Sequence, residues 1–338
     1  MSNTNKYLHS VLPSKKPKIY PQNIFSNKEE LQKKLRSEGI SITLDDVLKG
    51  GFFAQVYSAM LDGKAVVVKH VGSLTPFDPT EFYIPEKQFF TDIKVLKLLQ
   101  KSKKVRVPRI IASFPKIRTV ILEDMRESGF TLMSEQIMNK EFSLSSAQTV
   151  GSVTAHLMRD SRTWKEFATN ESAEQNIYER GLELRLLYPN SQSQYHALEK
   201  EFTENNKHFC WPDGHPKNVF VNNKGEVAFI DFGRSSWADQ CFMLPNFLAH
   251  IAVFSLCGYI PKDRAREYIL TAVKSYSEIE EVNEKQFCQY FAMEVLHRAA
   301  GKWMSGINSK EQKLALYNFG LSIFDDIIET INQLVLII

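Results

Sequence analysis

The sequence predicts an α+β protein built of two lobes, a small antiparallel β-sheet with one helix and a large, mostly helical lobe. In the first 122 residues, short segments rich in β-branched residues alternate with glycine turns, which is typical of antiparallel strands. Beyond residue 123, apolar residues recur at helical spacing over most of the chain. The length of 338 residues is sufficient for two such units.

The small lobe is expected to span residues 26–122, after a loose polar arm at residues 1–25. Ser26 and Glu29 have the spacing of a capping box, so a helix should begin there. Two glycine turns, one of them Gly50-Gly51, separate the segments that follow, which predicts an antiparallel meander. In chain order the expected elements are strands at 40–47, 55–60 and 65–68, a helix at 86–100, and strands at 105–113 and 118–122.

The large lobe is expected to span residues 123–338 and to be predominantly helical. Only two short strands are expected there, at 219–221 and 227–230. The most apolar stretch, 247–260, is too short to span a bilayer and is predicted to be a buried helix. The other expected helices are 147–159, 176–187, 194–204, 263–276, 284–303 and 313–336.

Composition excludes several classes of protein. Hydrophobic residues make up 43% of the chain and charged residues 24%, which are ordinary globular values and exclude wholesale disorder. The four cysteines lie far apart and form no CxxC pair, which argues against a zinc site and favours a reducing compartment. The N-terminal region has no apolar segment typical of a secretory signal. We therefore expect a cytoplasmic protein with no membrane span and no obligate protein partner.

The net charge of +3 is unevenly distributed along the chain. Residues 1–126 contain 22 Lys and Arg against 12 Asp and Glu, a balance of +10, and residues 127–338 contain 20 against 27, a balance of −7. A basic front half could bind polyphosphate, and an acidic rear half could receive a cation. Nucleic acid is not the expected partner, because the lysines of the front half lie mostly on predicted solvated helix faces without interleaved aromatic residues.

The strongest chemical signal is the segment 211–221, WPDGHPKNVFV, followed by IDFG at 230–233. Phosphoryl transfer from a nucleotide needs one carboxylate that orients the acceptor hydroxyl and takes its proton. It also needs an asparagine and a second carboxylate to hold the Mg²⁺ that bridges the phosphates. Asp213 and Asn218 lie five residues apart on one loop, and Asp231 returns to them after a short hairpin. Oxygen ligands of this kind suit Mg²⁺.

These motifs resemble the aminoglycoside phosphotransferase and choline kinase-like family, which has a protein kinase-like fold and typically shows HGDLHPGN followed by IDFG or IDFE. The resemblance implies that ATP or GTP, with Mg²⁺, phosphorylates a hydroxyl of a metabolite or antibiotic, amine-bearing alcohols included. By the same resemblance Asp213 is the catalytic residue, and Asn218 and Asp231 are the metal ligands. A sugar or a lipid-linked saccharide is an alternative acceptor. A pseudokinase that binds ligands without turnover is an alternative of a different class.

Three positions depart from the family pattern. Trp211 stands where histidine is usual, and we expect it to have a structural role in packing against the loop. Gly214 stands where a larger apolar residue is usual. Met243 replaces an aspartate that braces the catalytic loop in the family, so we expect the loop to lack that support.

The front half carries further matches. Gly50 and Gly51 resemble the glycine-rich loop in which backbone N–H groups approach phosphate oxygens. Lys69, at the end of the Val66–Val68 run, matches the lysine that contacts the α- and β-phosphates. Glu86, on the next helix, is the expected ion-pair partner of Lys69, and Glu81 is the second candidate.

The segment Ile121–Met125 resembles the hinge of the family, where backbone groups meet the edge of the adenine. Glu123 and Met125 are therefore expected to be nucleotide-binding residues.

Overall fold

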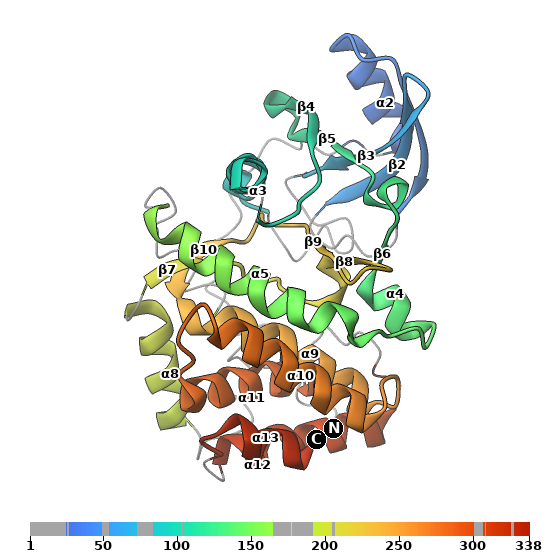
Figure 1. Cartoon of the computed structure of the whole chain (residues 1–338). Coiled ribbons are helices and arrows are strands. Elements are labelled where there is room, and N and C mark those ends of the chain that lie inside the picture. The colour runs from blue at the N-terminus through green and yellow to red at the C-terminus, as the bar shows by residue number, and fades with distance from the viewer. Residues whose placement is uncertain are drawn as a thin grey trace, which may run out of the picture.

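The computed structural model describes two lobes stacked one above the other (Figure 1). The described residues are 25, 27–48, 54–72, 84–102, 104–164, 177, 192–204, 207–300, 307, 309–325 and 328–338. Several expected features lie outside them: nearly all of the N-terminal arm, Ser26, the turn Gly50-Gly51, Glu81, and the helix at 176–187 apart from one residue.

The small lobe contains a five-stranded antiparallel sheet with the strand order β1-β2-β3-β5-β4. This confirms the predicted meander. The strand expected at 105–113 begins only at Ile110, because Pro108 has no N–H to donate to a neighbouring strand. The elements of this lobe are α2 (Lys28–Ser37), β1 (Ile42–Val47), β2 (Gln55–Leu61), β3 (Lys64–His70), α3 (Glu86–Ser102), β4 (Ile110–Phe114) and β5 (Thr119–Glu123).

The first helix has a different N-cap from the one expected. Asn27 precedes α2 and its side chain accepts a hydrogen bond from the backbone N–H of Glu30 at 2.9 Å. The predicted capping box of Ser26 and Glu29 is therefore wrong by one residue, since asparagine satisfies the same backbone donors as serine does.

Alternation along β3 sends its side chains to two different cores. Val66 and Val68 pack with Leu31 of α2 on one face of the sheet. Val67 and Lys69 point to the opposite face, which α3 covers. The lysine therefore lies between the sheet and α3, on the side that faces the large lobe.

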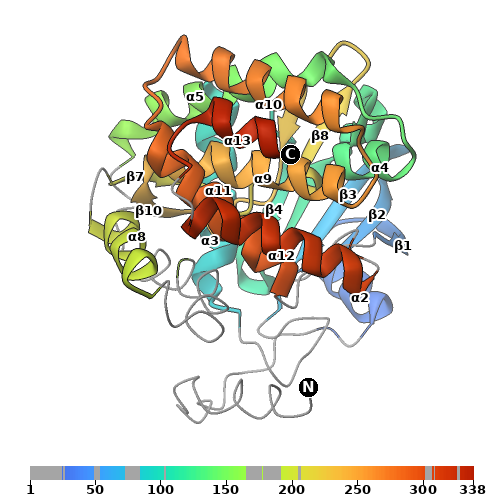
Figure 2. The same ribbon diagram turned by 90° about the horizontal axis from the view of Figure 1, so that it is seen from below.

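The large lobe is mostly helical, as predicted. Seen from below, α9 and α11 lie between α10 and α12 (Figure 2), and α9 is buried almost throughout, as expected for its apolar sequence. The helix expected at 313–336 is two helices, because Thr330 caps a new one through a capping box with Gln333. The helices are α4 (Met133–Met138), α5 (Ala147–Asp160), α8 (Gln192–Glu204), α9 (Met243–Leu256), α10 (Lys262–Ser277), α11 (Glu284–Ala300), α12 (Lys310–Asp325) and α13 (Ile331–Ile337).

Five short strands among the described residues of the large lobe position the loops of interest, where the sequence predicted two. The additional strands have three or four residues each and pair with segments distant in the chain, so local periodicity does not reveal them. Strand β6 pairs with β8, β8 pairs with β9, and β7 pairs with β10. The strands are β6 (Phe130–Leu132), β7 (Lys207–Cys210), β8 (Val219–Asn222), β9 (Val227–Phe229) and β10 (Ser236–Asp239).

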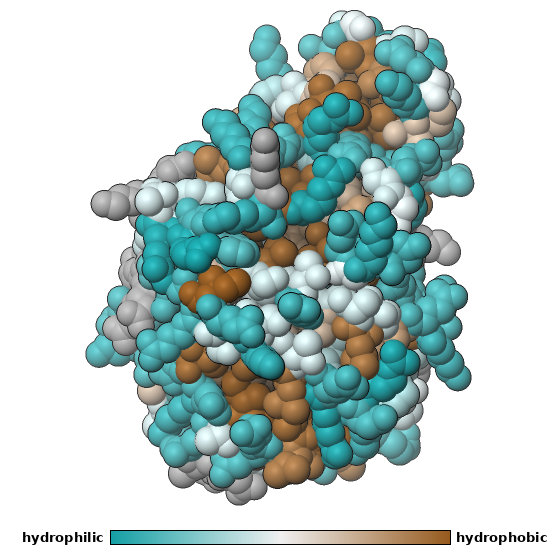
Figure 3. Space-filling view, viewed as in Figure 1, coloured by the Kyte–Doolittle hydropathy of each residue, from teal (hydrophilic) through white to brown (hydrophobic). Residues whose placement is uncertain are grey.

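The surface combines charged and apolar regions. On the face shown in Figure 3, hydrophobic residues reach the surface on the sheet lobe and on the lower part of the helical lobe. None of the helices in the described ranges is both long enough and apolar enough to cross a bilayer.

Candidate active site

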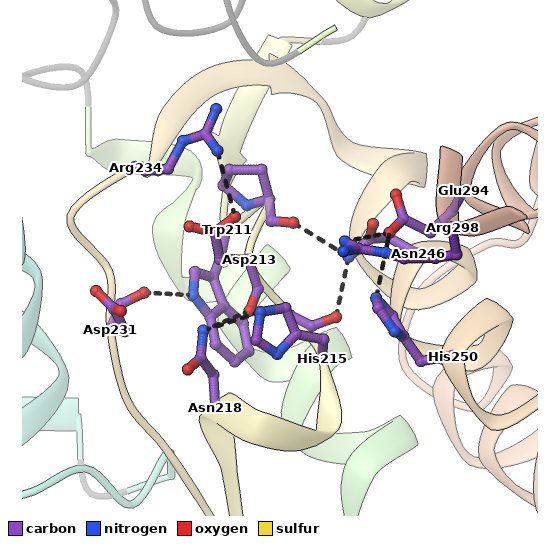
Figure 4. A network of polar contacts seen from close by, with 12 residues as sticks. Trp211, Asp213, His215, Asn218, Asp231, Arg234, Asn246, His250, Glu294 and Arg298 are labelled. Atoms are coloured by element: carbon purple, nitrogen blue, oxygen red, sulfur yellow. Dashed lines mark hydrogen bonds and ion pairs between the residues drawn. The ribbon is translucent and has the colours of Figure 1, made fainter. Parts of the chain in front are cut away.

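Two loops of the large lobe carry the predicted catalytic residues. One connects β7 to β8 and contains Asp213 and Asn218, and the other connects β9 to β10 and contains Asp231. The antiparallel pairs β7–β10 and β8–β9 hold the two loops next to each other. The three side chains therefore lie in one region although Asp231 is 18 residues away from Asp213 (Figure 4).

Lys69 reaches this region from the small lobe. Its Nζ lies 2.8 Å from Oδ1 of Asp231 and 2.7 Å from Oδ2 of Asp92, and the residue is only 8% exposed. Burial alone would lower the pKa of Lys69, but the two carboxylates outweigh it and raise the pKa above its ordinary value. Lys69 is therefore fully protonated at neutral pH.

The expected pairing of Lys69 with Glu86 is wrong. Glu86 is the exposed first residue of α3, whereas Asp92 lies six residues further along, about 9 Å along the helix axis. The lysine meets the middle of the helix and not its start. Asp92 occupies the buried face of α3 beside Phe89 and Ile93, and a carboxylate at such a position was the signal that could have identified it.

Asp92 also connects the lysine to the loop that follows β9. Its Oδ2 accepts a hydrogen bond from Lys69, and its Oδ1 accepts one from the backbone N–H of Phe232 at 2.9 Å. One buried carboxylate thus joins β3, α3 and the residue after Asp231.

Asp231 has a left-handed backbone conformation with φ of 62°, which costs a non-glycine residue about 1–2 kcal/mol. The indole N–H of Trp211 donates to the carbonyl of Asp231 at 2.9 Å. The indole ring lies 4.8 Å from the ring of Phe229 and 5.1 Å from that of Phe232, measured between centroids. The predicted structural role of Trp211 is therefore confirmed, since it supports the strained residue that carries the carboxylate.

The departure at Gly214 is linked to the one at Trp211. A Cβ atom added to Gly214 would lie 3.4 Å from Cε3 of the indole. A Cβ atom at that distance makes ordinary van der Waals contact, so residue 214 lies directly against the indole of Trp211.

Asn246 supports the loop where the family aspartate is absent. Its Nδ2 donates to the carbonyls of Pro212 at 3.1 Å and Gly214 at 2.9 Å. Asn246 lies three residues after Met243, one turn along α9 and on the same face of that helix. The expectation that the Met243 exchange leaves the loop without support is therefore wrong. An amide side chain in a predominantly apolar helix was the available signal.

Asn218 and Asp231 form a donor set that fits a magnesium ion. Nδ2 of Asn218 donates to the carbonyl of Asp213 at 3.0 Å. This bond turns the amide oxygen of Asn218 to the side on which Asp231 lies (Figure 4). One carboxylate and one amide oxygen match the few protein ligands that Mg²⁺ takes beside a nucleotide. No cluster of three or more His, Cys, Asp or Glu side chains suited to a metal is present in the described part of the chain.

Asp213 faces an arginine that the sequence interpretation missed. Nη1 of Arg234 lies 4.0 Å from Oδ1 of Asp213, and the two side chains are 12% and 14% exposed. Arg234 follows the IDFG motif directly, so the loop that carries the predicted metal ligand Asp231 also brings a cation to the predicted catalytic residue Asp213 (Figure 4).

A buried polar network connects the catalytic loop to α9 and α11. The ring of His215 lies 5.4 Å from that of His250, whose Nε2 is 3.2 Å from Oε1 of the fully buried Glu294. Nε of Arg298 donates to the same oxygen at 2.6 Å. Burial, followed by the nearby His250, holds the pKa of His215 well below its ordinary value, so this ring is neutral at pH 7. The i,i+4 spacing of Glu294 and Arg298, with Glu294 between the apolar Met293 and Val295, could have suggested an internal pair.

The hinge residues have engaged side chains. The carboxylate of Glu123 forms an ion pair with Arg106 and accepts hydrogen bonds from the N–H of Arg109 and the hydroxyl of Ser128. Met125 is buried in a small apolar cluster. Two backbone groups of the hinge are engaged as well: the N–H of Glu123 donates to the carbonyl of Arg109 at 2.9 Å, and the carbonyl of Met125 accepts from the N–H of Gly129.

Comparison of the sequence with known proteins finds no relative. No protein-family model matches the chain, and a search of curated proteins also finds no match.

The fold, in contrast, occurs in solved structures of small-molecule kinases. A choline kinase from Cryptosporidium parvum Iowa II is 13% identical, with a TM-score of 0.54, over 92% of this chain and 98% of its own. The choline kinase LicA from Streptococcus pneumoniae is 15% identical, with a TM-score of 0.52, over 88% and 99%. A spectinomycin phosphotransferase in complex with ADP and spectinomycin is 14% identical, with a TM-score of 0.51, over 91% and 97%. At such low identity these similarities establish the fold alone, and the predicted protein kinase-like, two-lobe fold is confirmed.

Proposed function

We propose that the chain is a small-molecule kinase that transfers the γ-phosphate of ATP or GTP, with Mg²⁺, to a hydroxyl of a metabolite or antibiotic. The contact that carries this proposal is the one between Lys69 and Asp231, which are 162 residues apart and come from different lobes. Asp213 and Asn218 lie on the adjacent loop. A cation for phosphates, two oxygen ligands for a metal and a separate carboxylate for the acceptor are the groups that phosphoryl transfer requires.

The small lobe and the hinge would bind the nucleotide. Lys69 has the charge and the position to contact the α- and β-phosphates. Gly50 and Gly51 would cover the phosphates with backbone N–H groups. The carbonyl of Glu123 and the N–H of Met125 would meet the base, because both side chains, the N–H of Glu123 and the carbonyl of Met125 are engaged by the protein itself.

Asn218 and Asp231 would hold the magnesium ion through the amide oxygen and the carboxylate. When bound, Mg²⁺ neutralises the charge of the phosphates. The hydrogen bonds of Asn218 to Asp213 and of Trp211 to Asp231 fix both ligands before a nucleotide arrives. Such fixed positions lower the entropy lost on reaching the transition state.

Asp213 would orient the acceptor hydroxyl towards the γ-phosphate and take its proton late, since the transition state of phosphoryl transfer is loose. Arg234 lies beside Asp213 and restrains the orientation of its carboxylate. Asparagine at residue 213 would keep the size and much of the hydrogen bonding of the side chain, but it would remove the charge and the proton acceptor.

Amine-bearing alcohols are the first acceptor class to test. Choline kinases and a spectinomycin phosphotransferase share the fold of this chain. Sugars and lipid-linked saccharides form the second class. The panel should include amino alcohols, aminoglycosides, macrolides, sugars and saccharide lipids, each with ATP and with GTP.

The decisive experiment compares wild type with Asp213→Asn. We expect transfer to fall by roughly 10²-fold or more, with nucleotide affinity nearly unchanged. Asp45→Asn, an exposed carboxylate on β1, is the matched control and should retain full activity. A fully active Asp213→Asn protein would refute the assignment of Asp213. A wild type that binds nucleotide but transfers phosphate to no acceptor of the panel would identify a pseudokinase.

A further inference from the structure

Asn218, the proposed metal ligand, has a fixed main chain. Its N–H donates to the carbonyl of His215 at 2.8 Å, and its own carbonyl accepts from the N–H of Ile230 at 3.0 Å. These bonds leave the side-chain amide free to turn about the bond that joins it to Cβ. The direction of the amide is decisive, since its oxygen can bind a metal ion and its NH₂ group cannot.

Two acceptors lie on the nitrogen side of this amide. Nδ2 of Asn218 donates to the carbonyl of Asp213 at 3.0 Å, and it lies 3.5 Å from Nε2 of His215. An amide nitrogen only donates, so Nε2 of His215 is the acceptor in this contact and the ring proton is on Nδ1. A reversed amide would place its oxygen against both acceptors. The carbonyl of Asp213 and the ring of His215 therefore keep the oxygen of Asn218 on the opposite side.

The ring of His215 packs in turn against helix α9. It lies 5.4 Å from the ring of His250 between centroids, with the two planes inclined by 58°. His250 follows Asn246 by four residues, so the two side chains lie on the same face of α9. Asn246 binds the carbonyls on both sides of Asp213, at residues 212 and 214. One face of α9 therefore holds both the backbone of the catalytic loop and the ring of His215 (Figure 4).

A buried ion pair of α11 lies behind His250. Nε2 of His250 is 3.2 Å from Oε1 of Glu294, and Nε of Arg298 donates to the same oxygen at 2.6 Å. Glu294 is fully buried. A buried ion pair loses its hydration and is often no more stabilising than an apolar pair of the same volume. The packing of α11 against α9 therefore does not by itself account for a carboxylate at this position.

We propose that Glu294 and His250 are positioning residues of the metal site, acting through His215 on the amide of Asn218. Glu294 fixes the ring of His250, this ring fixes that of His215, and His215 keeps the nitrogen of Asn218 turned away from the metal. The inference rests on the proposed function, which assigns the metal to Asn218. Because Glu294 and His250 would not themselves touch nucleotide, metal or acceptor, their loss should weaken the effect of Mg²⁺ and leave metal-free nucleotide binding unchanged.

Nucleotide binding tests this role without a known acceptor. Calorimetric titration of the full chain with ATP and with GTP, each with and without Mg²⁺, measures how much the metal tightens binding. His215→Phe keeps a ring but loses the acceptor for Asn218, so we expect the tightening to fall by about threefold to tenfold, the scale of one hydrogen bond. The double variant Glu294→Gln/Arg298→Gln removes both buried charges together and should also lower the tightening by about threefold or more.

Two further variants separate positioning from a general effect on packing. If the ion pair acts through His215, adding Glu294→Gln/Arg298→Gln to His215→Phe should lower the tightening no further, whereas independent structural effects would add. His215→Gln should keep most of the tightening, because its carbonyl oxygen can accept a hydrogen bond from Nδ2 of Asn218. All variants should bind the metal-free nucleotide with the affinity of wild type.

Lys285→Gln/Glu329→Gln is the matched control, since it removes an exposed ion pair of α11 and should leave the tightening unchanged. His250→Phe keeps the buried ion pair and a ring, and it gives a second test if the buried double variant folds poorly. Normal tightening in either His215→Phe or His250→Phe, or additive losses in the combined variant, would overturn this inference alone. A wild type that binds nucleotide equally well with and without Mg²⁺ would refute the metal site of the proposed function as well.

Discussion

Replacement of Asp92 by alanine would remove a carboxylate that has two partners in different parts of the molecule. Oδ2 of Asp92 lies 2.7 Å from Nζ of Lys69, and Oδ1 lies 2.9 Å from the backbone nitrogen of Phe232. With 2% exposure, Asp92 has almost no access to water that could replace either bond. The variant would therefore loosen α3 from both β3 and the loop that carries Asp231.

The expected loss of stability follows from these two contacts. A hydrogen bond between charged groups contributes about 1.5–3 kcal/mol, and a buried backbone N–H left without an acceptor costs about 1–3 kcal/mol. Lys69 keeps its second carboxylate, Asp231, so it does not become an unpaired buried charge. The free energy of unfolding should therefore fall by about 3–5 kcal/mol.

Urea unfolding of wild type, Asp92→Ala and Glu86→Gln tests this estimate. Glu86 is exposed at the start of α3, where an acidic side chain contributes only about 0.3–1 kcal/mol through the helix dipole. Asp92→Ala should thus be far more destabilising than Glu86→Gln. If Asp92→Ala unfolds within about 1 kcal/mol of wild type, or if Glu86→Gln is equally destabilised, the pairing described for Lys69 is incorrect.

Three further changes have defined outcomes. Lys69→Met should lower phosphate transfer by about 10²-fold or more while the circular dichroism spectrum stays unchanged. Lys64→Met, at an exposed position of the same strand, should retain normal transfer. Loss of transfer in Lys64→Met with normal transfer in Lys69→Met would show that the strand register is wrong. Trp211→Phe keeps an aromatic ring but loses the donor to the Asp231 carbonyl. Its unfolding free energy should fall by about 1 kcal/mol or more in urea titrations, and Mg²⁺-dependent nucleotide binding should weaken, whereas unaltered binding would contradict a role in positioning Asp231. Burial raises the pKa of Asp239 from 3.8 to about 6, so the folded chain retains the proton more strongly than the unfolded chain. Stability should therefore fall by up to about 3 kcal/mol as the pH rises from about 4 to about 6, and Asp239→Asn should lose this pH dependence in unfolding measured at several pH values.

The parts of the structure that depend on local pattern could be predicted from the sequence. The meander of the small lobe follows from β-branched segments separated by turns, because antiparallel strands close over a few residues. Asp213, Asn218 and Asp231 were identified because their spacing on two loops and a hairpin is itself local. The buried helix α9 was predicted by its apolar composition alone.

The partners of the site residues depended on how distant elements pack. The position of α3 against the sheet decides which carboxylate pairs with Lys69. The lysine reaches Asp92 in the middle of that helix and does not reach Glu86 at its start. The support of the catalytic loop by Asn246 likewise depends on how α9 packs beneath it. The sequence by itself determined the strands of the small-lobe meander, most of the helices and the chemical groups of the predicted site, since these follow from local periodicity and spacing. Only the tertiary structure decided which groups pair, because a contact between residues far apart in the chain forms only when their helices and strands have packed.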